Sequence, residues 1–124
     1  PQQLILPEAV LEFEVLSAQE VCTMGLNPGS GGSYYDYDLL DLPLTVRNRH
    51  AGDRMHPEGM DGSKKVKDLF IDQKVKPEDR SRLPLLFDGQ GRLLWIPTVR
   101  RSRFAHVTEE TKRILHIIYK KNIS

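Results

Sequence analysis

The sequence predicts a single α+β domain with a mainly antiparallel sheet and one main helix. Apolar and polar residues alternate over 10–17, which is the period of a half-buried strand. The turn sequence Asp88-Gly-Gln-Gly91 separates two apolar runs and predicts a hairpin. Val66, Leu69 and Phe70 recur at helical spacing. A chain of 124 residues has the usual length of one domain.

The first half of the chain is expected to form strands and turns. In the strand over 10–17, apolar side chains alternate with glutamates, so one face is acidic and wet. Residues 27–33 predict a flexible turn, and 34–49 predict two strand segments that break near Pro43. The side chains of this stretch that we expect to face the core are Leu44, Val46, Tyr37 and Leu39.

The second half of the chain is expected to contain the helices. Ser63 is a suitable N-cap for a helix over 64–73, which is the main helix of the prediction. A proline suits the first position of a short helical turn over 77–82. One helical turn over 108–112 then leads into a terminal strand, because the last segment alternates and is rich in β-branched residues.

Charge is sorted along the chain. No Lys or Arg precedes Arg47, so the first 42 residues carry a net charge of −7, whereas the remainder carries 18 basic and 10 acidic residues. We therefore expect acidic approach strands at 1–41 and a basic part at 42–119, whose field would attract a polyanion. The alternative is that the acidic segment folds back and neutralises the basic part.

Cysteine content and hydropathy restrict the class of protein. The lone Cys22 excludes an internal disulfide and a zinc-finger spacing, which fits a reducing compartment. No apolar run approaches the roughly 18 residues of a membrane span, and the N-terminal residues lack signal-peptide features. We expect a soluble, cytoplasmic chain without a membrane partner. Because it has no initiator Met, we also expect it to be cut from a longer protein.

Basic residues and glycines are densest over 49–75. Glycines let backbone N–H groups approach a ligand closely, and the start of the following helix would favour an anion. Lys64 and Lys65 would be unfavourable in the first helical turn unless a phosphate supplied negative charge. The alternative is that Asp61 and Asp68 neutralise them. The predicted phosphate contacts are Arg49, Arg54, Lys64, Lys65 and Lys67, and the predicted loop-shaping residues are Gly52, Asp53, Gly59 and Gly62.

A second basic cluster follows the predicted hairpin. It consists of Arg100, Arg101 and Arg103, of which the last two would share one face if the segment is extended. Guanidinium groups bind phosphate oxygens in pairs, so these arginines are predicted phosphate contacts as well. The alternative is a solvated surface run, and the same alternative applies to Arg47.

Candidates for catalysis and base stacking are weaker. The four histidines have no metal-ligand spacing, so neither a metal site nor a catalytic residue is predicted. Asp53 is expected to accept backbone N–H bonds or to orient Arg54 rather than act as a catalytic acid. A small hydrolase that uses Asp53, His56 and His106 is the least favoured hypothesis. Phe87 and Trp95 are expected in the core, and the remaining stacking candidates are Tyr34, Tyr35 and Tyr37, which have repulsive acidic neighbours.

A long irregular motif carries a family resemblance. The segment from Arg49 fits RxxGDRMxPxGMxGxKKxKD, and it continues through RSRLPLLFDGQGRLLWIP and Arg100-Arg101-Ser102. The stretch over about 42–119 resembles the C-terminal domain of tRNA(Ile)-lysidine synthetase. One departure is Lys76-Pro77, where the family places the proline one residue earlier.

The resemblance implies a fold similar to a domain of the bacterial phenylalanyl-tRNA synthetase β chain. It implies a parent enzyme that uses ATP, with Mg²⁺, to activate the wobble cytidine of isoleucine tRNA and then attaches lysine. The ATP site would lie in an N-terminal catalytic domain that is absent here, so 1–124 would be a non-catalytic tRNA-binding domain without a cofactor. It would recognise the acceptor-stem side of the tRNA.

The partners expected from the resemblance are isoleucine tRNA and the catalytic N-terminal domain of the parent chain, and a homodimer is an open alternative. A different hypothesis is an interdomain scaffold without direct RNA contact. That hypothesis predicts no measurable tRNA affinity and tight association with the separated catalytic domain.

Overall fold

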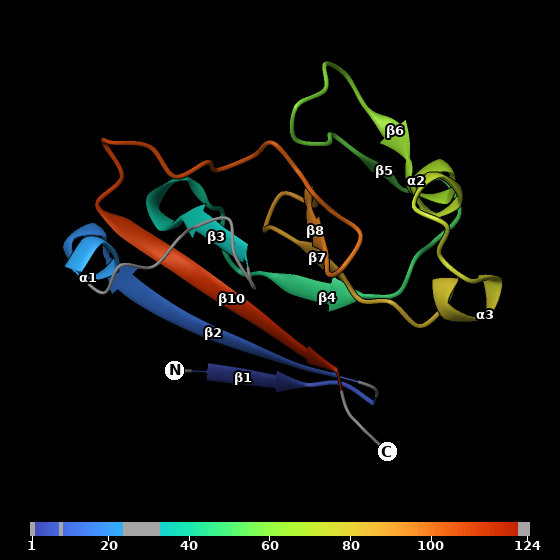
Figure 1. Cartoon of the computed structure of the whole chain (residues 1–124), viewed down its shortest axis with the longest axis horizontal. Coiled ribbons are helices and arrows are strands. Elements are labelled where there is room, and N and C mark those ends of the chain that lie inside the picture. Colours follow the sequence, from blue (N-terminus) through green and yellow to red (C-terminus); the bar gives the residue numbers. More distant parts are fainter. Residues whose placement is uncertain (1, 8, 24–32, 122–124) are drawn as a thin grey trace. The chain divides into compact units, whose positions relative to one another are not determined.

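The computed structural model describes residues 2–7, 9–23 and 33–121, and the chain divides into two compact units (Figure 1). Unit 1 contains Pro1–Leu40 and Ala105–Ser124, and unit 2 contains Asp41–Phe104. The chain therefore leaves unit 1 once and returns to it once. The predicted turn at 27–33 lies outside the described residues except for Ser33.

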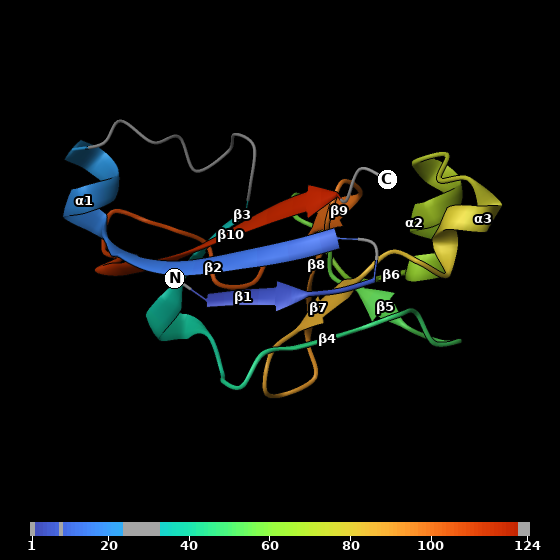
Figure 2. The same ribbon diagram turned by 90° about the horizontal axis from the view of Figure 1, so that it is seen from below.

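Unit 1 is built on a four-stranded antiparallel sheet with the strand order β1-β2-β10-β3. Its strands are β1 (Gln2–Ile5), β2 (Ala9–Ser17), β3 (Ser33–Asp36) and β10 (Arg113–Lys121). The two long strands pair along their whole length, and both views show β1, β2 and β10 side by side (Figures 1 and 2). The predicted strand over 10–17 and the predicted terminal strand are confirmed.

A short helix that was not predicted, α1 (Ala18–Thr23), continues directly from β2. The Glu20 N–H donates to Ser17 Oγ at 3.0 Å, and the Ser17 N–H donates to Glu20 Oε1 at 3.3 Å. This reciprocal pair is a capping box, and the Ser-x-x-Glu spacing was visible in the sequence. The buried Val21 packs with Leu16, Tyr34 and Ile114 into a small apolar cluster.

The stretch after β3 differs from the prediction, because Leu39 does not lie in the core. Asp36 Oδ1 accepts the Asp38 N–H at 3.1 Å and begins a 3-10 turn, η1 (Tyr37–Leu39), so the strand ends early. Leu39 is consequently 59% exposed, whereas Tyr34 and Tyr35 are buried. Tyr34 stacks on His116 with 4.2 Å between the ring centroids. The two buried tyrosines therefore offer no ring face for stacking an RNA base.

The predicted helical turn over 108–112 is also wrong. The Thr111 N–H donates to the Thr108 carbonyl at 3.1 Å, which closes a single turn without a helix. The Thr111 hydroxyl donates to Asp36 Oδ2 at 2.9 Å, so this residue is anchored to the end of β3. Local hydrogen bonds also hold this turn, because the Thr108 N–H donates to Thr111 Oγ1 at 2.8 Å and the Glu110 N–H donates to Thr108 Oγ1 at 3.2 Å.

Unit 2 contains a four-stranded antiparallel sheet, with the order β4-β7-β8-β9, and a two-stranded sheet. The four strands are β4 (Thr45–Arg47), β7 (Leu85–Phe87), β8 (Leu93–Ile96) and β9 (Arg100–Arg101), and the small sheet pairs β5 (Arg54–Met55) with β6 (Lys64–Lys65). The predicted hairpin is formed by β7 and β8. Asp88 Oδ1 closes its turn by accepting the N–H groups of Gln90 at 2.9 Å and Arg92 at 2.8 Å.

Two helices complete unit 2. The predicted main helix is α2 (Val66–Asp72), which begins two residues later than expected, and the predicted short turn is α3 (Pro77–Arg80). Ser63 does not cap α2, because its hydroxyl accepts a hydrogen bond from Arg54 Nε at 2.8 Å. Lys65 occupies the N-cap position without a side-chain hydrogen bond.

The core of unit 2 lies between α2 and the strands. Val66, Leu69 and Phe70 of α2 are buried, as their spacing predicted, and they pack with Met55, Leu85, Phe87, Leu93 and Ile96. Phe87 and Trp95 are 6% and 9% exposed, which confirms that both are core residues. Leu44 and Val46 are half-buried. The α+β class with a mainly antiparallel sheet and one main helix is therefore confirmed.

Candidate nucleic-acid interface

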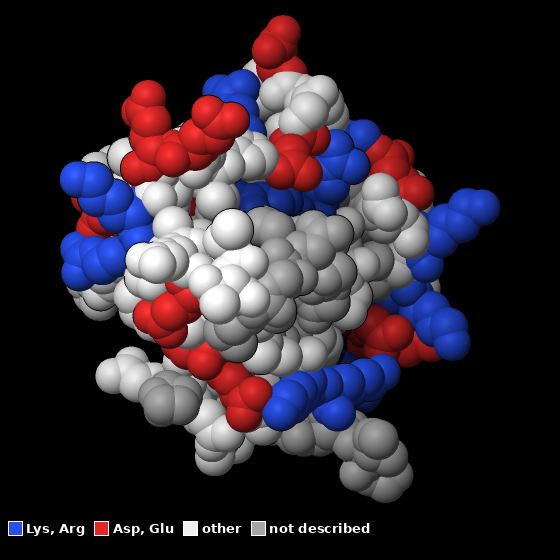
Figure 3. Space-filling view, turned by 60° about the vertical axis from the view of Figure 1, so that its left-hand side comes forward, with Lys and Arg blue, Asp and Glu red and all other residues white. Residues whose placement is uncertain are grey.

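Charge is divided between the two units. Unit 2 contains 14 basic and 9 acidic residues, whereas unit 1 contains 4 basic and 8 acidic residues. Within unit 1, Asp38 pairs with Arg113, and Glu12 pairs with Lys120 at 2.9 Å. On the face drawn in Figure 3, acidic and basic side chains are interspersed. The excess of positive charge that could attract a polyanion belongs to unit 2.

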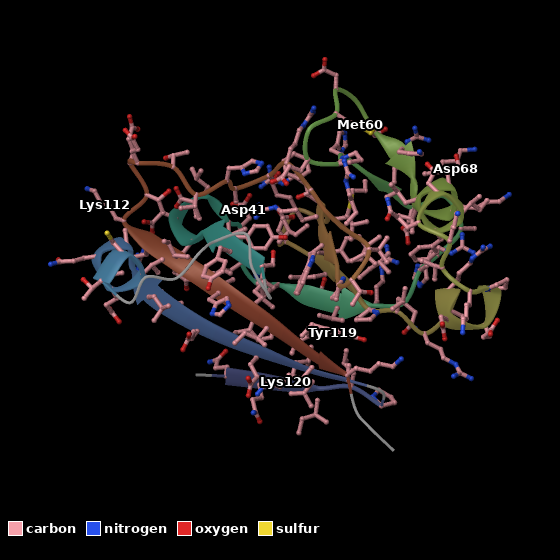
Figure 4. All side chains as sticks on the ribbon, viewed as in Figure 1. Asp41, Met60, Asp68, Lys112, Tyr119 and Lys120 are labelled. Atoms are coloured by element: carbon pink, nitrogen blue, oxygen red, sulfur yellow. The ribbon has the colours of Figure 1, made fainter. Side chains whose placement is uncertain are left out.

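The loop at 56–63 connects β5 and β6 and carries Met60 (Figure 4). Gly59 and Gly62 have φ values of +81° and +76°, a region that side chains with a β-carbon rarely adopt. At both glycines a built β-carbon meets nothing within 4 Å, so the restriction is the backbone conformation and not space. Gly52, with φ of +88°, lies in the turn before β5.

The predicted arginine cluster is bonded to this loop. Arg100 Nη2 donates to the Glu58 carbonyl at 2.7 Å, and Arg103 Nη1 donates to the Met60 carbonyl at 3.4 Å. The backbones are also joined, because the Glu58 N–H donates to the Arg101 carbonyl at 3.1 Å. Two segments more than 40 residues apart in the sequence are thus held together by the arginine segment.

Arg101 is the most enclosed member of the cluster. Its Nε donates to the Ser102 carbonyl and its Nη2 donates to the Phe104 carbonyl, both at 3.0 Å. The Glu58 carboxylate lies 3.6 Å from Nε, and the Arg101 side chain is 18% exposed. The Arg101 guanidinium therefore helps to hold the local backbone. The alternative that this arginine belongs to a solvated surface run does not apply to it.

Asp53 pairs with Arg47 and not with Arg54. Arg47 Nη1 and Nη2 each lie 2.9 Å from one oxygen of the Asp53 carboxylate, and the His50 N–H donates to Oδ2 at 2.7 Å. The hydrogen bonds from Arg47 are the main reason that the pKa of Asp53 is lowered. Arg47 also lies over the Phe87 ring, 4.2 Å from its centroid. The expected orientation of Arg54 by Asp53 is therefore wrong, and Asp53 is a fixed anion, unsuited to the role of catalytic acid.

The remaining predicted contacts fall into two groups. Arg54 donates to Ser63 Oγ and, at 3.3 Å, to the Ser63 carbonyl, and Lys64 forms an ion pair with Asp72. In contrast, Arg49, Lys65 and Lys67 have no hydrogen-bond or ion-pair partner for their side chains within the described residues. The partner of Lys64 is thus neither Asp61 nor Asp68, which were the neutralising residues considered from the sequence.

The expected phosphate at a helix N-terminus is not supported by the geometry. Lys64 and Lys65 precede α2 and pair with Met55 and Arg54 in the small sheet. They are therefore not in the first helical turn, and α2 has only seven residues. A phosphate at the N-terminus of α2 is therefore not needed to explain the presence of the two lysines.

The described part of the chain contains neither a metal cluster nor a membrane-spanning helix. No group of three or more His, Cys, Asp or Glu residues there is placed to hold a metal ion. No helix there is both long and apolar enough to cross a membrane. Cys22 is exposed on α1.

Comparison with known proteins identifies relatives of the chain. A family model described as the TilS substrate C-terminal domain matches residues 44–118. The bifunctional protein TilS/HprT of Listeria monocytogenes serotype 4b (strain F2365) is 42% identical over 108 residues, which are 87% of this chain and 16% of that protein. The tRNA(Ile)-lysidine synthase of Bacillus subtilis (strain 168) is 50% identical over 63 residues, or 51% of this chain and 13% of that enzyme. The chain thus spans about one sixth or less of the length of these two relatives.

Solved structures agree with this relationship. The crystal structure of a TilS C-terminal domain matches with a TM-score of 0.83 and 31% identity, covering 100% of this chain and 93% of that one. An N-terminal fragment of the phenylalanyl-tRNA synthetase β-subunit from Pyrococcus horikoshii matches with a TM-score of 0.63. At 15% identity, over 89% of this chain and 39% of that one, the second match confirms the expected similarity of fold alone. The chain belongs to the family of TilS C-terminal domains, the C-terminal regions of tRNA(Ile)-lysidine synthases.

Proposed function

We propose that this chain is the tRNA-binding part of a tRNA(Ile)-lysidine synthase that attaches lysine to the wobble cytidine of isoleucine tRNA. The observation that carries the proposal is a basic unit whose glycine loop is held in place by arginines. The family relationship supplies the identity of the nucleic acid. In this proposal the chain binds the tRNA and performs no catalysis of its own.

The predicted RNA contacts in this proposal come from the two basic clusters of unit 2. They are Arg49, Arg54, Lys64, Lys65, Lys67, Arg100, Arg101 and Arg103. A guanidinium has five N–H donors, and Arg100 and Arg103 each use one in the contacts with the loop. The donors that remain can bind phosphate oxygens without a change in the position of the side chain.

The aromatic side chains of unit 2 favour recognition of the RNA backbone over recognition of bases. Phe87 and Trp95 are buried, and Arg92 covers Phe104 at 4.8 Å from its ring centroid. Duplex RNA is bound mainly through its phosphates and its shape, which agrees with a surface of Lys and Arg. This supports the proposal that the domain grips the acceptor-stem side, which is double-stranded.

ATP and Mg²⁺ are assigned to the catalytic domain of the parent enzyme. The described residues contain no acidic cluster that fits Mg²⁺. In this proposal the chain therefore takes no part in the chemical steps of the ligase reaction. The other partner in the proposal is that catalytic domain, and the compartment is the cytoplasm. Association of two copies of the domain is an open part of the proposal.

Binding of fluorescently labelled isoleucine tRNA to the 124-residue chain, measured by anisotropy over a salt series, tests the proposal. We expect salt-dependent binding that is retained by a minihelix of the acceptor stem and lost by the anticodon stem-loop. The variant Lys64→Ala with Lys65→Ala should bind more weakly and with a smaller salt slope. Absence of binding to any tRNA at low salt would contradict the proposal, and equal binding of both fragments would contradict the acceptor-side assignment.

The second candidate function is an interdomain scaffold. It is favoured by one observation, which is that five of the eight predicted RNA contacts already have intramolecular partners: Arg54, Lys64, Arg100, Arg101 and Arg103. A scaffold would bind the separately produced catalytic domain tightly and tRNA not at all. Calorimetry with both partners distinguishes the two functions.

A further inference from the structure

We propose that unit 2 contacts RNA mainly through its cations that lack an intramolecular partner, and that this surface extends beyond α2 to Lys74 and Lys76. The inference rests on the proposed tRNA binding and adds Lys74 and Lys76 to the RNA contacts predicted above. We call this set the free-cation surface. It consists of Arg49, Lys65, Lys67, Lys74 and Lys76.

The members of the surface share one property, which is the absence of a side-chain partner. Within the described part of the chain, none of the five makes a side-chain hydrogen bond or an ion pair. The neighbouring Lys64, by comparison, is paired with Asp72. A phosphate that binds Lys64 must compete with Asp72, whereas a phosphate that binds Lys65 displaces only water.

The four lysines follow one another along a short path in the fold. Lys65 ends β6, Lys67 lies in the first turn of α2, and Lys74 and Lys76 connect α2 to α3. Both ribbon views show α2 beside α3 (Figures 1 and 2). All four side chains are exposed, so one extended polyanion can reach them from solvent.

Helix periodicity keeps this surface apart from the core. Val66, Leu69 and Phe70 occupy the buried side of α2, whereas Lys67 and Ile71, four residues apart, share the exposed side. Ile71 is 49% exposed. Lys67 is therefore free of any packing role and can move to a phosphate.

The backbone at Lys74 gives a second observation. Lys74 has φ of +56° at the position after the C-cap of α2, where glycine is the unstrained residue. The Val75 N–H donates to the Phe70 carbonyl at 2.9 Å and fixes this conformation. The chain thus carries a lysine at a position where glycine would stabilise the fold, and an ionic contact with RNA accounts for that choice.

The acidic residues nearby do not cancel the surface. Apart from Asp72, which is bound to Lys64, the carboxylates of α2 and α3 form no ion pair with the described residues: Asp68, Glu78 and Asp79. Figure 4 labels Asp68 on α2. These carboxylates lower the field of the surface but do not reverse it, because residues 64–80 contain six basic and four acidic residues and keep a net charge of +2.

The test compares paired lysine-to-glutamine variants of the 124-residue chain for binding to isoleucine tRNA over a salt series. One variant carries Lys65→Gln with Lys67→Gln, and another carries Lys74→Gln with Lys76→Gln. The matched control carries Lys112→Gln with Lys121→Gln, which removes the same charge from exposed lysines of unit 1 that form no ion pair with another described residue. Thermal unfolding verifies that each variant is folded.

We expect each of the two unit 2 pairs to lower the salt slope by roughly 1.5, since each phosphate contact contributes about 0.7–0.9. The Lys112 and Lys121 control should keep the wild-type slope. Wild-type slopes in the Lys74 and Lys76 variant would overturn the extension of the surface while leaving tRNA binding by the domain intact. An equal loss in the unit 1 control would show an effect of net charge alone and would overturn the inference.

Two further outcomes separate this inference from the function on which it rests. If the wild-type chain binds no tRNA, the proposed function fails first and the inference fails with it. If the lysine variants lose affinity for the separately produced catalytic domain but not for tRNA, the surface docks a protein and the inference is wrong.

Discussion

The Asp53 carboxylate accepts hydrogen bonds from both terminal nitrogens of the Arg47 guanidinium, each at 2.9 Å. The pair fixes the end of β4 to the turn that precedes β5. The pair is half-enclosed, since the two side chains are 13% and 35% exposed for Asp53 and Arg47. Charge-assisted bidentate pairs have a fixed geometry, so this contact sets the direction in which the chain enters the glycine loop. The loop at 56–63, which lies between the predicted RNA contacts Arg54 and Lys64, is therefore oriented by two residues outside it.

Replacement of Asp53 by Asn should lower the free energy of unfolding by about 2 kcal/mol, because charged hydrogen bonds are lost while the Arg47 charge remains. Urea unfolding followed by circular dichroism measures the change. Asp61→Asn is the matched control, since Asp61 is exposed and forms no ion pair within the described residues, and we expect it to change stability by less than about 0.5 kcal/mol. Equal stabilities of the two variants would contradict the role of the Asp53 pair.

The same contact predicts a dependence of stability on pH. The pKa of Asp53 is lowered in the folded state, mainly by its hydrogen bonds with Arg47, so the unfolded state binds a proton more readily than the folded state. The stabilisation is therefore fully present above the unfolded pKa of about 4 and is lost as the pH falls through the folded pKa. The difference in unfolding free energy between wild type and Asp53→Asn should be constant from pH 7 to 5 and should shrink below about pH 4. A difference that grows in acid would refute this assignment.

Gly89 should not accept even the smallest side chain. A β-carbon on Gly89 would lie 2.6 Å from the carbonyl oxygen and 2.9 Å from the carbonyl carbon of Leu42, and both atoms are backbone. The Gly89 N–H also donates to the Asp41 carbonyl at 2.6 Å, so the two segments cannot separate without the loss of this bond. Gly89→Ala should lower the free energy of unfolding by about 1–3 kcal/mol, measured by thermal or urea unfolding. Ser81→Ala, at an exposed side chain, should be neutral, and an unaffected Gly89→Ala would disprove the close approach.

Local patterns identified most elements of the fold but not the contacts that organise the site. Periodicity located the strand that became β2 and the helix that became α2. The start of α2 was misplaced because Lys64 and Lys65 pair with Met55 and Arg54, and a pairing across a loop leaves no local signal. The misplaced start of α2 thus coincides with a pairing across a loop, whereas the early end of β3 comes from the local hydrogen bond between Asp36 and Asp38.

The candidate site shows the same limit. Residue type and spacing selected the basic residues of unit 2, yet the acceptors of Arg100 and Arg103 are backbone carbonyls 42 and 43 residues away. A carbonyl exists at every residue, so sequence alone cannot tell which one a guanidinium will use. For Arg47 the sequence left open a solvated surface run, whereas in the structure its guanidinium binds the carboxylate of Asp53, six residues away.

Thr98 is the residue at which a substitution should increase stability. Its φ is +67°, in a turn after Pro97 that is closed by the Val99 N–H donating to the Ile96 carbonyl at 2.9 Å. A β-branched side chain is strained in this region at a cost of roughly 1–3 kcal/mol, whereas glycine adopts it freely but loses more entropy on folding.

Thr98→Gly should therefore raise the free energy of unfolding by about 1 kcal/mol, measured by urea unfolding. Thr98→Ala retains a β-carbon at the same φ and should gain much less, so it is the matched control. Because Thr98 lies two residues before Arg100, tRNA binding should be measured on both variants. If Thr98→Gly is more stable and keeps its affinity for tRNA, the backbone strain at Thr98 is not needed for binding. If Thr98→Gly is less stable than wild type, the turn does not hold this conformation in solution.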